Sequence, residues 1–483
     1  MLNQTKLDED KITNVFDSEN FRTQGHQIID LLADYLKDIS ENKITKVLPS
    51  ICPDKMLENW ANDFKNPTVN NIEEIIKDVV SQSNHLHHPH YIGRQVSPPL
   101  PAAALCDFVS SFLNNGSAIF EMGPVNTAME KNIINWMANL VGFGIDSDGF
   151  LTSGGTLGNL TALLAARQIK SGENTLKTGL ANHIPLCMLV SEQSHYSIKK
   201  AAQIMGIGDD GVIKVSVDEN YCIDINALKS SYEKAVNEGK KVISVVANAC
   251  STSTGSYDPI DVIADFCEEH DLWLHVDGAH GASALLSEKY KYLLKGIERA
   301  DSVIWDAHKM LLMPTLITAV LFKNGGNSYK AFSQKASYLF NESSQNWYDL
   351  ALRTLECNKG MMGLKLYTSL SMYGQDFFSD YVTKMYDLTR KFAAIVENSD
   401  DFELAIQPQS NIICFRYLPK IECNLNEIQK EIRKKIIESG LFYIVQTDLK
   451  GTIYLRCTII NPLTTENDLI DLLKQIRGLV YTY

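Results

Sequence analysis

The hydrophobic positions of this chain follow two different periodicities. Near the N-terminus, Ile28, Leu32 and Tyr35 recur at helical spacing, and a second helix is expected over residues 71–81. From residue 149 onward, short apolar runs of strand length alternate with segments of helical pattern. Alternating β and α elements predict a mostly parallel sheet with right-handed crossover connections.

Three parts follow from the order of these elements. The strands are expected at residues 149–152, 187–190, 242–247, 272–276, 302–305 and 317–322, and helices at 159–170 and 259–270. Later elements are a helix at 376–398, strands near 411–417 and 451–458, and a terminal helix from 465. We therefore predict a helical N-terminal segment (residues 1–90), a large α/β domain with a mainly parallel sheet (91–370) and a smaller α+β C-terminal domain (371–483).

Composition narrows the classes of protein to which the chain can belong. Hydrophobic residues make up 45% and charged residues 21% of the chain, which is ordinary for a globular protein. The net charge of −13 argues against nucleic acid or an anionic membrane as partner. The 10 cysteines form no CxxC pair, and the N-terminus has no apolar signal core, so we expect reduced thiols and a cytoplasmic location. No apolar run reaches membrane-spanning length.

Polar residues that can take part in catalysis or ligand binding lie at the ends of two expected strands. Asp277 follows the strand at 272–276, and the strand at 302–305 leads into Asp306-Ala-His-Lys309. Open α/β sheets place their ligand sites at the carboxyl ends of their strands. A lysine and a carboxylate that converge there suit pyridoxal 5′-phosphate (PLP), because the lysine forms a Schiff base and the carboxylate pairs with the protonated ring nitrogen.

A glycine-rich loop, Ser153-Gly-Gly-Thr156, joins the strand at 149–152 to the next helix. Glycines allow backbone N–H groups to approach an anion, and a helix N-terminus favours negative charge. The loop lacks the lysine of a P-loop and the GxGxxG pattern, so nucleotide binding is disfavoured. The His-rich run at 85–90 has no matching set of carboxylates, and we interpret it as a polar loop rather than a metal site.

Several runs together resemble the group II PLP-dependent amino-acid decarboxylases, which include glutamate, cysteine-sulfinate, aromatic and diaminobutyrate decarboxylases. They occur in the family's order, over roughly residues 70–375. The matching runs are Thr152-Ser-Gly-Gly-Thr-Leu-Gly-Asn159, Ser194-His-Tyr196, Ser251-Thr252, His275-Val-Asp-Gly-Ala279 and Asp306-Ala-His-Lys309. The resemblance implies PLP as cofactor, a large domain of fold type I (PLP-dependent transferase-like), and decarboxylation of an L-amino acid to an amine and CO₂.

The resemblance also implies roles for the matched residues. Lys309 bonds the cofactor, Asp277 pairs with its ring nitrogen, and His195 stacks on its ring. Asp306 stands where some members carry asparagine, and its carboxylate would repel a phosphate. The complete cofactor-binding set that the resemblance implies is Gly155, Thr156, His195, Thr252, Asp277, Ala279, His308 and Lys309.

Residues that meet the substrate are implied in the same way. Tyr338 lies in the stretch that resembles the family's mobile catalytic loop and is the expected proton donor to the substrate carbon, with Tyr348 as the alternative. Arg94 stands where aromatic decarboxylases carry an aromatic residue, and Lys359 where many relatives have an arginine for the α-carboxylate. The two cations predict a small polar substrate, either acidic or diamino.

Assembly and two other classes of function complete the interpretation. The resemblance and the amphipathic N-terminal segment predict a homodimer. An aminotransferase or lyase of the same fold would share Lys309, Asp277 and the glycine-rich loop, but His195 and the sequence Asp306-Ala-His-Lys309 favour a decarboxylase. The other alternative is a non-catalytic binding protein on the same fold.

Overall fold

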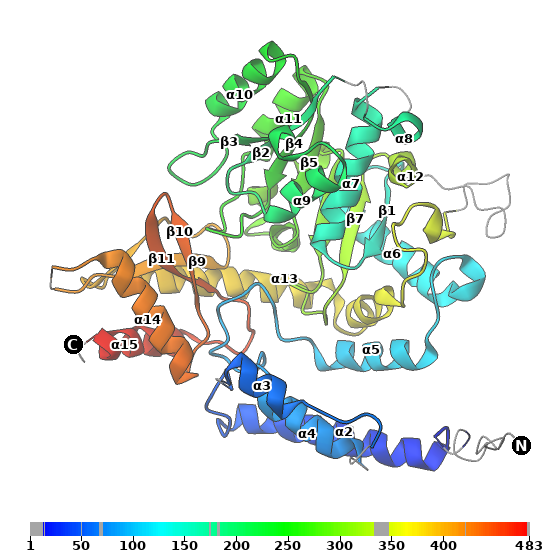
Figure 1. Ribbon diagram of the computed structural model, residues 1–483. Helices are drawn as coiled ribbons and strands as arrows, with labels where there is room; N and C mark the ends of the chain where they lie inside the picture. The colour runs from blue at the N-terminus through cyan, green and yellow to red at the C-terminus, as the bar shows by residue number, and fades with distance from the viewer. Residues whose placement is uncertain are drawn as a thin grey trace, which may run out of the picture.

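The structure is a computed structural model. It describes residues 13, 15–49, 51–66, 71–172, 175–180, 184–332, 347–420 and 422–480. Figure 1 shows a helical arm, a large body around a sheet, and a smaller C-terminal unit with a sheet of its own. Within the described residues, no helix is both long and apolar enough to cross a membrane. None of the 10 cysteines is joined in a disulfide.

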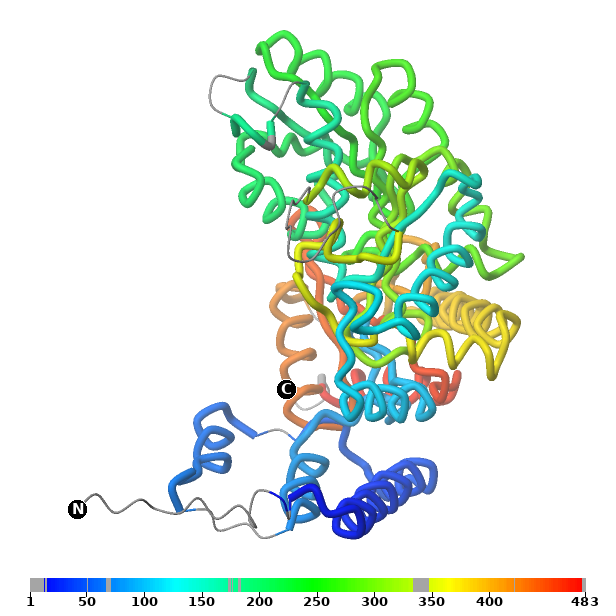
Figure 2. Tube along the Cα trace, turned by 90° about the vertical axis from the view of Figure 1, so that its right-hand side faces the viewer, coloured from blue at the N-terminus to red at the C-terminus, as the bar shows by residue number. Residues whose placement is uncertain are grey.

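The N-terminal helices form an arm that projects from the large domain (Figure 2). They are α2 (Ser18–Ser40), α3 (Pro53–Asn59) and α4 (Ile72–Gln82). The side chain of Asp17 caps α2 by accepting a hydrogen bond from the amide of Asn20, and Asn71 caps α4 in the same way. Phe21 and Ile29 of α2 remain exposed, so the described part of the chain leaves an apolar face of this arm uncovered.

The large domain is built on a 7-stranded sheet in the order β1-β7-β6-β5-β4-β2-β3. Its strands are β1 (Asp148–Thr152), β2 (Leu186–Ser191), β3 (Val212–Val215), β4 (Lys241–Asn248), β5 (Trp273–Asp277), β6 (Ser302–Asp306) and β7 (Thr318–Phe322). Strand β7 runs antiparallel to both of its neighbours, whereas β3, β2, β4, β5 and β6 are parallel. The predicted mostly parallel α/β sheet is confirmed.

Alternate residues along each strand enter two apolar layers. Met188 and Val190 of β2 pack with Leu163 of α7 (Gly155–Lys170) and with α9 (Tyr196–Ile204). Cys187 and Leu189 point to the opposite face, into the main core with α6 (Pro124–Val141), α10 (Ile225–Asn237) and α11 (Ile260–Glu269). The other helices of this domain are α5 (Pro101–Leu113), α8 (Thr175–Thr178) and α12 (Ser328–Ala331).

The C-terminal unit has an antiparallel 4-stranded sheet in the order β10-β11-β9-β8. Its elements are β8 (Phe402–Leu404), β9 (Ile412–Tyr417), α14 (Leu425–Ser439), β10 (Val445–Leu449), β11 (Thr452–Thr458) and α15 (Glu466–Val480). Short 3₁₀ turns complete the fold: Phe120–Met122, Asp209–Gly211, Gly281–Leu286, Lys291–Leu294, Ile297–Arg299, Gly325–Asn327 and Leu350–Leu352.

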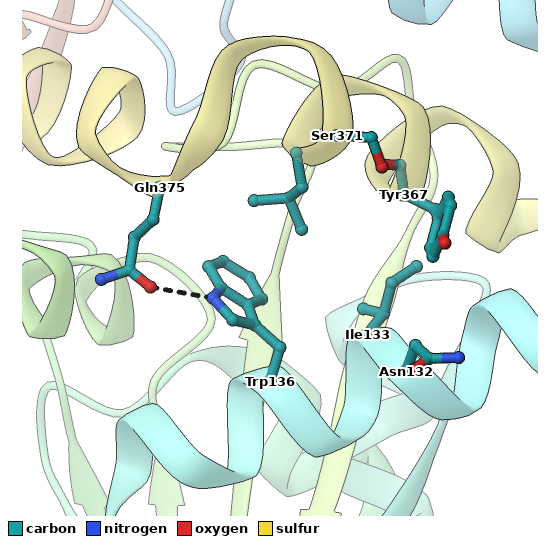
Figure 3. A pocket seen from close by; sticks show the side chains of 7 residues that line it. Asn132, Ile133, Trp136, Tyr367, Ser371 and Gln375 are labelled. Atoms are coloured by element: carbon teal, nitrogen blue, oxygen red, sulfur yellow. Dashed lines mark hydrogen bonds between the residues drawn. The ribbon is translucent and has the colours of Figure 1, made fainter.

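The helix α13 (Met362–Glu397) runs from the large domain into the C-terminal unit. Gly374, with a φ of 74°, divides this span into two helices that meet at a kink. The helix that the sequence predicted from residue 376 matches the part after Gly374, whereas the helix before it was not predicted. A pocket of about 280 Å³ lies beside the break, between α13 and α6, where the indole N–H of Trp136 donates to Oε1 of Gln375 over 2.9 Å (Figure 3).

The other differences from the sequence concern elements with weak periodicity. The helix expected to begin at residue 159 begins at Gly155, so the glycine-rich loop contributes the first helical turn. Helices α5, α6 and α14 and strands β3, β8 and β10 were not predicted. In α5 and α6 a proline occupies the first helical position, where its missing N–H has no intrahelical partner to lose.

Candidate active site

The carboxyl ends of β5 and β6 carry the centre of the candidate site. The two strands are parallel, and Asp277 and Asp306 are their last residues. Lys309 lies just beyond β6, with its Nζ 3.0 Å from Oδ2 of Asp306. The charge of Asp277 also acts on Lys309. The structure thus brings together the lysine and the acid that the strand ends predicted.

The two carboxylates determine the charge of Lys309. Burial lowers the pKa of this amine, but Asp306 and Asp277 outweigh burial and raise the pKa above its ordinary value. Burial raises the pKa of Asp306, whereas Lys309 and His308 lower it more, so that the net shift is downward. At neutral pH, Lys309 is an ammonium and Asp306 a carboxylate.

A directed chain of hydrogen bonds holds Asp277. The indole N–H of Trp273 donates to Oγ of Ser302 over 2.8 Å, and Ser302 then donates to Nδ1 of His275 over 2.9 Å. Nε2 of His275 donates to Oδ1 of Asn159 over 2.8 Å, and Nδ2 of Asn159 donates to Oδ2 of Asp277 over 2.9 Å. Because an indole only donates and an ionised carboxylate only accepts, the direction and the His275 tautomer are fixed. Burial lowers the pKa of His275 to about 4, so its ring is neutral.

His195 is tied to the same amide. Its Nδ1 accepts a hydrogen bond from the backbone N–H of Ser197 over 3.3 Å and lies 2.8 Å from Oγ of Ser197. That hydroxyl accepts from Nδ2 of Asn159 over 2.9 Å. Burial lowers the pKa of His195, which keeps the imidazole neutral and suited to stack on an aromatic ring. Asn159 therefore positions both His195 and Asp277.

The glycine-rich loop forms an anion-binding helix start. Gly154 has a φ of +115°, a conformation that favours glycine, and Gly155 is the first residue of α7. A Cβ on Gly155 would lie 3.3 Å from both carboxylate oxygens of Asp306. No side chain caps α7, so the amides of Gly155 and Thr156 are available to an anion, whereas that of Leu157 donates to the carbonyl of Gly154. His308 reaches the same place, with its Nε2 3.6 Å from Oδ2 of Asp306.

Thr252 and Ala279 lie on the loops that follow β4 and β5. The amide of the buried Ala279 donates to Oδ1 of Asp277 over 3.3 Å. The carbonyl of Thr252 accepts a hydrogen bond from Nη1 of Arg456 on β11. This bond brings the C-terminal unit into direct contact with the site.

The two cations that were expected to meet substrate lie in different surroundings. Lys359 is buried, and its Nζ donates to Oε1 of Glu130 over 2.6 Å and to the carbonyl of Leu151 over 2.5 Å. Burial lowers the pKa of Lys359, and its amine is engaged by these two acceptors. Arg94 is exposed, and its Nε donates to the hydroxyl of Tyr443 over 3.1 Å. Because this partner is a hydroxyl and not a carboxylate, it does not compensate the positive charge of Arg94.

Arg456 is a buried cation that the sequence analysis did not identify. Its side chain is 6% exposed, and its Nε has no hydrogen-bond partner within the described residues. Burial lowers the pKa of its guanidinium, and Arg94 and Cys250 act on it electrostatically. Cys250 in turn is influenced by Lys309, so Arg456 belongs to the surroundings of the central lysine. An arginine in the apolar run of residues 452–458 was the available signal.

Tyr338 and Tyr348 are the two candidates for the proton donor. Tyr338 lies outside the described residues. Tyr348, the alternative, packs edge-on against Phe120 with 5.5 Å between ring centroids. The identity of the donor stays a prediction.

Comparisons with known proteins agree with this geometry. A family model described as the pyridoxal-dependent decarboxylase conserved domain matches residues 53–418. The chain belongs to this family. It is 29% identical over 468 residues to an aromatic-L-amino-acid decarboxylase from Bacillus atrophaeus, covering 96% of each protein. It is 30% identical over 417 residues to the human acidic amino acid decarboxylase GADL1, covering 83% of this chain and 80% of that protein.

A solved structure extends the likeness to the whole fold. The glutamate decarboxylase domain of a diaminobutyrate-pyruvate transaminase and L-2,4-diaminobutyrate decarboxylase from Vibrio parahaemolyticus matches with a TM-score of 0.86 at 26% identity, covering 97% of each chain. The predicted family, fold type I, PLP cofactor and decarboxylase activity are therefore confirmed for this PLP-dependent amino-acid decarboxylase.

The residues of the decarboxylase fit PLP on their own chemistry. The site offers an amine beside two carboxylates, a neutral imidazole, and uncapped amides at the start of α7. These groups suit, in order, the aldehyde and ring nitrogen, the ring face and the phosphate of the cofactor. Lys309, Asp277, His195 and Gly155 would hold it.

The first prediction locates the covalent bond to the cofactor. Borohydride should fix PLP to Lys309, because hydride reduces the bond between cofactor and lysine to a stable amine. Peptide mapping by mass spectrometry reads the labelled position. Lys309→Ala should fold normally and lose turnover and label, whereas Lys234→Ala, which removes an exposed lysine of α10, should keep both. A label on a different lysine contradicts the assignment.

The second prediction tests the role of Asn159. Asn159→Leu keeps the branching of the side chain but removes the donor to Asp277, so PLP affinity should fall about ten- to hundredfold, as for other residues that orient a binding group. A fluorescence titration of the apoenzyme with PLP measures the change. Asn132→Leu on α6 is the matched control, since its amide donates to the carbonyl of Ala128 within its own helix. Equal PLP affinity in both variants would refute the role.

Proposed function

We propose that this decarboxylase acts on a small polar L-amino acid, acidic in preference to diamino, rather than on an aromatic one. The observation that carries the proposal is the pair of arginines, Arg94 and Arg456. Within the described residues, the hydrogen bonds of both go to neutral oxygen atoms, those of Tyr443 and Thr252. An acidic amino acid brings two carboxylates, which are the groups that guanidinium binds best.

The comparisons leave the substrate to be argued from these side chains. The similar proteins carry names that refer to aromatic, acidic and diaminobutyrate substrates. Lys359, the earlier candidate for the α-carboxylate, is engaged by Glu130, and Arg456 with its unbonded Nε replaces it in the proposal. A diamino acid would add a third cation near Arg94 and Arg456, and like charges repel.

The residues of the chain would prepare the reaction in separate ways. Bound PLP supplies a sink for the electrons left on the substrate carbon when CO₂ departs. Asp277, held by Asn159, would place a negative charge at the ring nitrogen, and His195, held through Ser197, would cover the ring and exclude water. Lys309 would hold the cofactor through its amine, beside Asp306 at 3.0 Å. The arginines would orient the substrate, which is the protein's part in lowering the barrier.

We also propose that the enzyme is a cytoplasmic homodimer. Its 10 free cysteines support a reducing compartment. Exposed aromatic side chains support a partner: Phe112 of α5 is 64% exposed, and its ring lies 4.8 Å from that of Phe21, which is 45% exposed. An apolar patch shared by α2 and α5 suits an interface with a second copy.

The substrate proposal predicts the order of activity in a panel of amino acids. CO₂ release from glutamate, aspartate or cysteine sulfinate should exceed that from tryptophan, tyrosine or dihydroxyphenylalanine. Arg94→Gln should raise KM for the best acidic substrate about tenfold or more, since a hydrogen bond to a charged group contributes about 1.5–3 kcal/mol. Tyr443→Phe is the matched control, because it removes the hydroxyl that Arg94 contacts but keeps the cation. A preference for an aromatic amino acid, or an unchanged KM in Arg94→Gln, disproves the proposal.

The assembly proposal predicts the molecular mass of the enzyme in solution. Light scattering after gel filtration should give about twice the 54.1 kDa of the chain. Phe112→Asp should shift the enzyme toward monomer, because it places a charge in the apolar patch. Val236→Asp on α10, a side chain that is 48% exposed far along the chain from this patch, should leave the dimer intact. A monomer with full activity would show that the proposal is wrong.

A further inference from the structure

Asp306 is a buried carboxylate beside the place where an anion binds. Its side chain is 2% exposed. A Cβ on Gly155, the first residue of the uncapped helix α7, would lie 3.3 Å from both of its oxygens. The amides of this helix start are the phosphate-binding groups of the site. The fold therefore places a negative charge next to the position that the cofactor phosphate, itself a dianion, takes up.

In the chain itself, three neighbours compensate the charge of Asp306. Nζ of Lys309 lies 3.0 Å from Oδ2, and the hydroxyl of Thr318 donates to Oδ1 over 2.5 Å. Nε2 of His308 lies 3.6 Å from Oδ2. Nδ1 of His308 faces both the carbonyl and the amide of Ile317, at 2.9 and 3.2 Å, so this ring can carry its proton on either nitrogen.

Cofactor binding changes this balance in two ways. Lys309 bonds the cofactor through the same nitrogen that now contacts Asp306, so the ammonium loses N–H groups that served the carboxylate. The phosphate adds two negative charges at the start of α7. Both changes favour a neutral carboxylic acid, or a cationic imidazole next to the carboxylate.

We propose that the buried pair of Asp306 and His308 takes up one proton from solvent when the phosphate of PLP binds at the start of α7. The protonated pair then presents a donor instead of a bare negative charge. The proposal rests on the cofactor that the family shows and is independent of the substrate. It concerns a cofactor-binding pair and needs no further reactant.

The groups that act on the pair come from several elements. Lys309, just after β6, acts on Asp306, and Asp277 on β5 acts on Lys309. Asp306 also acts on His195 at the start of α9 and on His280 after β5. Burial lowers the pKa of both histidines, so they are neutral near pH 8 and offer no compensating charge. The charged groups that remain near the pair are Lys309, Asp277 and the buried Lys365 of α13, which acts on His308 and is itself paired with Asp107 of α5 over 3.1 Å.

The expected pH dependence follows from linkage. Lys309 and His308 hold the pKa of Asp306 below its ordinary value, although burial by itself raises it. The bound phosphate favours the protonated pair and so raises its pKa. Between the pKa of the pair in the free protein and its higher pKa in the PLP-bound protein, the bound form holds one proton more than the free form. PLP affinity should therefore fall by up to about tenfold per pH unit as pH rises through that range.

Calorimetry counts the proton directly. Heats of PLP binding to apoenzyme at pH 8, measured in two buffers of different ionisation enthalpy, give the number of protons taken up. Pyridoxal is the matched ligand, because it forms the same bond to Lys309 but carries no phosphate. The PLP count minus the pyridoxal count should be close to one for the natural enzyme. A difference near zero overturns the proposal without any variant.

Asp306→Asn tests the carboxylate. The amide keeps the shape of the side chain but carries no charge, so the phosphate-specific proton count should fall to near zero and PLP should bind with a flatter pH dependence. An unchanged count in this variant overturns the role of Asp306. The ³¹P resonance of PLP bound to the natural enzyme completes the test: a dianion's shift places the proton on the protein, and a monoanion's shift contradicts the proposal. No substrate is needed, so a wrong substrate proposal leaves these results unaffected.

Discussion

The buried carboxylate of Asp277 is the constraint on which the rest of the active site depends. A charge removed from water is costly unless hydrogen bonds compensate it, and the required donors must themselves be satisfied. The compensation begins at an indole that can only donate and passes through Ser302, His275 and Asn159. These polar side chains occupy fully or almost fully buried positions on β6, β5 and α7. The site is therefore built into the interior of the sheet and not only on its loops.

The same constraint explains why neighbouring groups are neutral or paired. Burial keeps His275 and His195 uncharged, so neither compensates the charge of Asp277. The positive charge that acts on Asp277 is that of Lys309. Lys309 in turn is shared between Asp277 and Asp306, one at the end of each parallel strand. Three ionised groups in a buried volume are tolerable only when opposite charges alternate. The order of strands β5 and β6 in the sheet provides that alternation.

Much of this site could be predicted from local sequence, because its residues stand where strands end and helices begin. Lys309, Asp277 and Gly155 interrupt apolar runs with groups that have no packing role. The parts that were missed depend on contacts between distant segments. Lys359 pairs with Glu130 across 229 residues, and Arg456 reaches Thr252 across 204, and no local pattern reports such a pair. Asn159 was included in a matching run, but its role could not be predicted. Its Nδ2 donates to Ser197 and Asp277 only because α7 packs against β5 in the fold.

The hydrogen bond between Arg456 and the carbonyl of Thr252 joins two structural units that contribute different residues to the candidate site. The groups suited to the cofactor come from the large sheet, whereas Arg456 and Tyr443, the residue that contacts Arg94, come from the C-terminal unit. Under the proposed role of these arginines, selectivity is physically separable from the chemistry of decarboxylation. Drift in the C-terminal unit would then alter which amino acid is accepted while the cofactor-binding residues are preserved. A single scaffold can in this way give rise to enzymes of diverse specificity.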